Sequence, residues 1–253
     1  GGPAISTPRG TQLTYSLRNA TGAKTRWSVN GTNRANELGD FTRAISGSIA
    51  ARPRPSFQVT FTPNYLYEQG TPATFNGPIN RQFLTTLTGG REETYGRRYI
   101  FGVVDRTTLS MQFRLNYTFK PDLTLDLYME PFAASGRYSA LGELAAPRQP
   151  DLRFYGTDGT TIRRLDDLSY VVTDGPTSFT LPNRDFNVRS FRSNVVLRWE
   201  WRPGSILYFV WQQNRSETLS TGEHVSAGDL LEAFSARGVN VLALKTTLWF
   251  TRR

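Results

Sequence analysis

The chain has 253 residues, of which 38% are hydrophobic and 13% aromatic, and its formal net charge is +9. No run of about 18 consecutive apolar residues occurs, which excludes a bundle of transmembrane helices. Cysteine is absent, which excludes disulfides, thiolate metal sites and a cysteine nucleophile. The 30 lysines and arginines are scattered singly along the sequence, so nucleic acid is not an expected partner.

Runs of alternating apolar and polar residues recur along the whole chain, and each predicts a β-strand with two different faces. Residues 107–119 are typical, because Leu109, Met111 and Phe113 alternate with Ser110, Gln112 and other polar residues. We expect eleven such strands in a meander: 11–19, 24–35, 41–52, 56–67, 80–88, 97–105, 107–119, 122–134, 187–202, 205–215 and 239–250.

Strand length favours a membrane over a soluble core. Residues 107–119 form a run of 13, whereas strands of soluble domains cluster around 5–6 residues and a tilted membrane-crossing strand needs roughly 9–11. The predicted fold class is therefore all-β: an antiparallel up-and-down transmembrane β-barrel that occupies residues 1–253 as a single domain.

The predicted connections are sorted by length, as they are in outer-membrane barrels, which have short periplasmic turns and long external loops. We assign the short links to one rim: 19–24, 53–55, 89–96, 120–122 and 202–204. We assign to the other rim 37–40, 68–79, a turn at Asp105-Arg106, an extracellular loop 135–186 and the segment 216–238. Within the long loop, Asp158-Gly159 predicts a small hairpin between 151–155 and 161–166, with a further short strand at 168–173. Residues 227–236 predict the one helix.

An odd number of strands conflicts with the even number found in bacterial single-chain barrels. Together with a first residue, Gly1, that is not an initiator Met, the count predicts that the chain is the C-terminal part of a larger barrel. The upstream part of the same polypeptide would then be its partner.

The two parities of the strands predict two environments. Candidates for lining the lumen are Arg114, Asp126, Glu130, Arg192, Arg198, Glu200 and Lys245. Candidates for facing lipid or forming an aromatic girdle are Leu109, Met111, Phe113, Leu115, Leu125, Leu127, Trp199, Trp201, Trp211 and Phe250.

Residues for chemistry are sparse, and no catalytic, cofactor-binding or metal-binding residue is predicted. The single histidine, His224, lies in a loop beside Glu223 and Ser226, but sequence neighbours do not by themselves form a triad. The acidic residues of the long loop lack the spacing of a calcium motif and are expected to be solvated: Asp151, Asp158, Asp166, Asp167 and Asp174. Two alternatives stay open, a soluble β-sandwich that binds glycans through exposed Trp and Tyr, and a membrane-embedded hydrolase centred on His224.

Several segments resemble one bacterial family: GGP at the start, RRYIFGVVDRTTLSMQFRLNYTFKPDLTLDLYMEPFAASGRYS, DFNVRSFRSNVVLRWEWRPGSILYFVWQQNRS and the final strand. The family is the C-terminal barrel, called domain of unknown function 5916, of proteins with an N-terminal carbohydrate-binding family 9-like module. The WEWRPGS turn is its most specific piece, and Thr251-Arg252-Arg253 after Phe250 is a departure, because an assembly signal usually ends on the aromatic residue.

The resemblance implies an outer-membrane location in a Gram-negative bacterium and a link to carbohydrate binding or uptake through the N-terminal module. The expected function is a porin-like barrel that forms or scaffolds a polar passage. Its expected partners are membrane lipid and a glycan or small polar solute. It implies no enzymatic residues and no cofactor.

Overall fold

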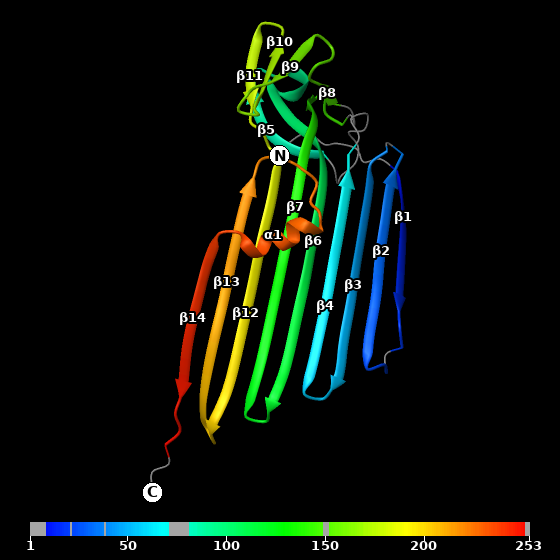
Figure 1. Ribbon diagram of the computed structural model, residues 1–253. Helices are drawn as coiled ribbons and strands as arrows, with labels where there is room; N and C mark the ends of the chain where they lie inside the picture. Colours follow the sequence, from blue (N-terminus) through cyan, green and yellow to red (C-terminus); the bar gives the residue numbers. More distant parts are fainter. Residues whose placement is uncertain (1–8, 21, 38, 71–80, 149–151, 251–253) are drawn as a thin grey trace.

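The computed structural model describes residues 9–20, 22–37, 39–70, 81–148 and 152–250 (Figure 1). Strands dominate it, every paired strand is antiparallel to its neighbour, and the one α-helix, α1 (Ala227–Glu232), has six residues. The predicted all-β antiparallel fold is therefore confirmed. Helices long and apolar enough to cross a bilayer are not found among these residues.

One large sheet forms the body of the molecule. Its hydrogen-bonded order is β1-β2-β3-β4-β6-β7-β12-β13-β14, and β5 and β8 join it as partners of β6 and β7. The nine strands of the main path are β1 (Gly10–Arg18), β2 (Thr25–Asn36), β3 (Phe41–Arg54), β4 (Phe57–Gln69), β6 (Arg97–Lys120), β7 (Leu123–Leu144), β12 (Phe186–Arg202), β13 (Ser205–Leu219) and β14 (Gly238–Thr247). The turns β1–β2, β3–β4, β6–β7 and β12–β13 lie at the lower end of the sheet in Figure 1.

The prediction of a turn at Asp105-Arg106 is wrong, because both residues lie within β6, a continuous strand of 24 residues. Neighbouring strands satisfy the two charges: the carboxylate of Glu68 on β4 lies 2.8 Å from Arg106, and Asp105 accepts a hydrogen bond from the Gly70 amide. The two strands expected at 97–105 and 107–119 are therefore one. As a result, the link 89–96, expected among the short turns, lies at the opposite end.

The strands β6 and β7 extend beyond the rest of the sheet and carry a cap (Figure 1). There β5 (Arg81–Thr88) pairs with the first residues of β6, and β8 (Leu152–Phe154) pairs with the last residues of β7. A separate sheet, ordered β11-β10-β9, consists of β9 (Thr160–Arg164), β10 (Tyr170–Asp174) and β11 (Thr177–Leu181).

The segment expected as loop 135–186 thus differs from its prediction. Its first ten residues belong to β7. The hairpin expected across Asp158-Gly159 does not form, since β8 pairs with β7 and β9 pairs with β10. Asp158 and Gly159 do take the positive φ values of a tight turn, 48° and 75°.

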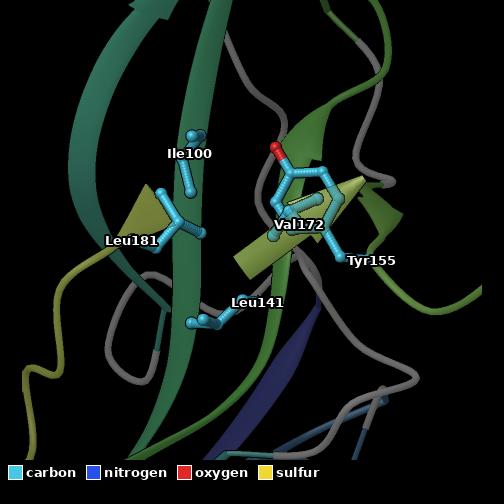
Figure 2. Close-up of a cluster of buried hydrophobic side chains, with 5 residues drawn as sticks. All are labelled: Ile100, Leu141, Tyr155, Val172 and Leu181. Carbon is cyan, nitrogen blue, oxygen red and sulfur yellow. The ribbon is translucent and has the colours of Figure 1, made fainter. Parts of the chain in front are cut away.

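The cap has its own hydrophobic core. Figure 2 shows five buried side chains that converge from the β6–β7 extension and the small sheet: Ile100, Leu141, Tyr155, Val172 and Leu181. Ile100 and Val172 are fully buried. Apolar burial of this kind contributes to the stability of the cap.

The main sheet is open in the part of the chain that the structure describes. Its edge strands β1 and β14 do not pair with each other. Eight successive antiparallel pairings separate them, so β1 and β14 run in the same direction. The eleven-stranded meander is therefore corrected to nine strands in one path with two short additions, and a closed barrel is not observed.

Candidate functional site

The register of the main sheet separates two faces. Cross-strand partners in an antiparallel sheet point to the same side, and Leu115 lies opposite Leu127, which lies opposite Val195, which lies opposite Trp211. On the other side of β6, Leu115 lies opposite Val59. We call the side that carries these residues the apolar face and the opposite side the polar face.

The sequence-predicted site residues sort onto these faces. Register places all seven lumen candidates on the polar face: Arg114, Asp126, Glu130, Arg192, Arg198, Glu200 and Lys245. Most lipid candidates lie on the apolar face: Leu109, Met111, Phe113, Leu115, Leu125, Leu127, Trp199 and Trp211. Trp201 lies at a register shift and Phe250 beyond the end of β14, so register assigns neither to a face.

The carboxylates of the polar face all have partners. Glu130 accepts hydrogen bonds from the hydroxyl of Tyr128 at 2.7 Å and from the amide of Gln112 at 3.2 Å. Glu200 pairs with Arg198 at 2.9 Å. Asp126 accepts a hydrogen bond from Asn116. Glu200 thus has a cationic partner, while Glu130 and Asp126 are held by neutral hydrogen-bond donors.

The apolar face carries a continuous band of hydrophobic side chains from β1 to β14. The band is centred on Tyr15 in β1, between Leu13 and Leu17, and on Phe113 in β6. In β14 it is centred on Leu244, which is 72% exposed. The small sheet packs on the β6–β7 extension and not on the band. At the cap-side limit of the band, Phe191 packs against Phe234 of the segment 220–237 and is 4% exposed.

The band crosses the sheet obliquely to the hydrogen-bonded rows. We call a series of successive cross-strand partners a row. The row that starts at Tyr15 on β1 passes through β2, β3 and β4 and reaches β6 at Leu109. The row of Leu244 reaches β6 at Tyr117. These rows are eight residues apart on β6, and eight strand-to-strand steps separate β1 from β14, so the band shifts by one residue per strand. On β6, midway between the edges, its centre at Phe113 lies midway between the rows.

Polar side chains that interrupt the band satisfy one another. Ser193 donates to the side chain of Gln213 at 3.1 Å, and Gln213 donates to Asn240 at 2.7 Å. Aromatic residues mark the limits of the band, with Tyr67 at one limit and Trp199 at the other. Trp211, a candidate for facing lipid or forming a girdle, lies in the middle of β13 opposite Val195.

Beyond the band, towards the cap, the apolar face is covered by the segment 220–237. His224 Nδ1 lies 2.9 Å from the hydroxyl of Thr107, and its ring lies beside that of Tyr67. Arg189 holds the segment through Asp229 at 2.7 Å. The hydroxyl of Ser226 donates to Asp229, not to His224, so the residues expected side by side in a hydrolase have different partners.

The cap contains a charged quartet that the sequence did not suggest. Arg98 contacts Glu143 and Asp174, each at 2.8 Å, and Arg153 contacts the same two carboxylates at 3.2 and 2.8 Å. All four side chains are at least four-fifths buried. Asp174, expected to be solvated, is therefore fixed, and the guanidinium of Arg153 lowers its pKa to about 2. Burial raises the pKa of the neighbouring Tyr155 hydroxyl.

A scan against models of protein families and a search of curated proteins found no match to this chain.

Proposed function

We propose that this chain is an outer-membrane β-barrel protein whose apolar face contacts lipid and whose polar face lines a passage for polar solutes. The oblique apolar band is the observation that carries the proposal. A band that faces lipid must lie parallel to the membrane, so its slope against the hydrogen-bonded rows gives the tilt of the strands. The band shifts by one residue, a rise of about 3.4 Å, for each strand spacing of about 4.8 Å. The ratio of these two lengths is the tangent of the tilt angle, which is therefore about 35°. Transmembrane barrels have tilts of about 35–45°.

The height of the band supports the same proposal. On β6 the apolar residues that register assigns to this face extend from Leu109 to Tyr117, and Phe119 follows at a register shift. At a tilt of about 35° this stretch spans about 22 Å along the membrane normal, close to the apolar band of about 25 Å that surrounds outer-membrane barrels.

Closure of the sheet sets a condition on the rest of the barrel. Because β1 and β14 run in the same direction, an antiparallel barrel that contains this sheet needs an odd number of further strands between them. We propose that they come from an upstream part of the same polypeptide, in line with the resemblance to domain of unknown function 5916. A link to carbohydrate uptake rests on that resemblance alone.

A matched pair of substitutions tests the proposal. Phe113→Arg places a charge at the centre of the band, and Gln112→Arg places the same charge one residue away on the polar face, within reach of Glu130. Arginine at the bilayer midplane costs about 2–4 kcal/mol. In the polypeptide that includes the further strands, we therefore expect Phe113→Arg to lower the fraction that inserts into lipid vesicles and migrates as a heat-modifiable band on gels. We expect Gln112→Arg to behave as wild type.

Two results would count against the membrane proposal. One is a wild-type protein that is monodisperse in plain buffer and migrates identically with and without boiling. The other is equal insertion by both variants. The first result would favour a soluble β-sandwich, and Trp211→Ala would then be tested for loss of glycan binding.

A further inference from the structure

The positive charges of the polar face are concentrated at one corner of the sheet. At the short-turn end of β1, β2 and β3 this face carries Arg18, Arg26 and Arg52, and the described parts of these three strands contain no carboxylate. The carboxylates of the polar face lie on other strands, and each already has a partner there. The corner therefore keeps an uncompensated positive charge.

These three arginines form a diagonal across the three strands. Arg18 lies opposite Ser28, two residues from Arg26, and Arg26 lies opposite Ala50, two residues from Arg52. Diagonal neighbours of this kind have Cβ atoms about 7–8 Å apart, a distance that long arginine side chains bridge. Lys24 adjoins the diagonal, because its carbonyl accepts a hydrogen bond from the Arg52 amide.

The surface between these side chains is hollowed. One depression is lined by Arg18, Arg26 and the small residues Ser28, Ser48 and Ala50. A second depression, lined by Lys24, Arg26 and Arg52, adjoins it and shares Arg26 and Ala50. We call Arg18, Lys24, Arg26 and Arg52 the basic corner.

The basic corner has no counter-ion of its own. None of its four side chains forms an ion pair with any residue that the structure describes. All four residues are exposed. Elsewhere on the polar face two arginines have carboxylate partners: Arg106 pairs with Glu68, and Arg198 pairs with Glu200.

We propose that the basic corner binds a small multivalent anion, of the phosphate or polyphosphate class, at the short-turn end of the polar face. Guanidinium groups bind phosphate oxygens in pairs, and several converging cations favour a ligand with several negative charges over a monovalent one. This inference rests on the proposed function, because it names the class of solute that the polar face binds. The two proposals depend on different observations: the proposed function on the geometry of the apolar band, and the anion site on the distribution of charge.

Tripolyphosphate is the probe, and its binding to the full chain in detergent is measured by titration calorimetry at two salt concentrations. We expect saturable binding that weakens with salt. The double variant Arg26→Gln/Arg52→Gln should raise the Kd at least tenfold. The control double variant Arg91→Gln/Arg97→Gln removes the same net charge from exposed residues at the cap end of the molecule, and its Kd should equal that of the wild type. Heat-modifiable migration verifies that each variant is folded.

The outcomes separate the two proposals. Absence of saturable binding in a heat-modifiable wild type, or equal weakening in both double variants, overturns the anion site and leaves the barrel proposal standing. Site-specific binding by a protein that is monodisperse without detergent supports the anion site and overturns the barrel.

Discussion

Removing one charge from the buried quartet of the cap should loosen the cap without opening the main sheet. Glu143 is the most buried member, with 4% of its side chain exposed, and it contacts both Arg98 and Arg153. Its Oε2 also accepts a hydrogen bond from the Tyr155 hydroxyl. Glu143→Gln keeps the shape of the side chain but leaves two arginines facing the single charge of Asp174.

Breaking a buried ion pair by removing one partner costs about 3–5 kcal/mol, because the remaining charge stays buried without compensation. At 1.36 kcal/mol per factor of ten, this loss corresponds to roughly two to nearly four powers of ten in the opening equilibrium. Amide hydrogen exchange followed by mass spectrometry reports that equilibrium for each segment. Exchange in β9 and β10 should accelerate by this factor, while exchange in β12 and β13 stays unchanged.

Glu93→Gln provides the control, because Glu93 is an exposed carboxylate in the same cap, on the 3-10 turn Glu92–Thr94. Its effect should be below about 0.5 kcal/mol. Equal exchange in wild type and Glu143→Gln would show that the quartet does not hold the cap. Acceleration throughout the main sheet would show that the cap and the sheet are one cooperative unit.

Three further predictions concern other contacts. Asp174 has a pKa lowered from 3.8 to about 2 in the folded chain, so its stabilisation is complete above pH 4 and lost as the pH falls towards 2, which hydrogen exchange of β10 should record. Gly31→Val places a Cβ 2.1 Å from the ring of Tyr15 and should destabilise the sheet by about 1–3 kcal/mol in denaturation, whereas Gly22→Ala meets no atom within 4 Å and should not. Arg189→Ala removes the ion pairs to Asp229 and Glu232 and should speed proteolysis within 220–237; an unchanged rate would show that these ion pairs do not hold the segment.

The alternation of the sequence predicted the strands and their two faces well, because a period of two follows from strand geometry alone. Its error at Asp105-Arg106 has a physical reason. Two adjacent charged residues are typical of a turn, but here Arg106 pairs with Glu68 from β4. Such a partner lies far away in the sequence, so local pattern cannot reveal it.

The cap was predicted least well for the same reason. The quartet joins Arg98 to Asp174, and only the tertiary fold brings these residues together. The basic corner was hidden too, because Arg18, Arg26 and Arg52 are single charges in the sequence and become neighbours only through the register of three strands. A scattered distribution of charge along the chain therefore does not imply a scattered distribution on the sheet.

Depth measurement by site-directed spin labelling tests the orientation of the apolar band most directly. The chain contains no cysteine, so single cysteines can be introduced at chosen positions and labelled without background. Relative accessibility to oxygen, which concentrates in lipid, and to a water-soluble nickel complex then gives the depth of each label in vesicles.

If the strands tilt by about 35° in a membrane, labels at Tyr15, Phe113 and Leu244 should lie at one depth near the bilayer centre. Labels at Leu109 and Tyr117 should then lie on opposite sides of that depth, about 22 Å apart along the normal. Depths that follow the hydrogen-bonded rows instead, with Tyr15 level with Leu109, or labels that are all accessible to the nickel complex, would contradict a lipid-facing apolar band.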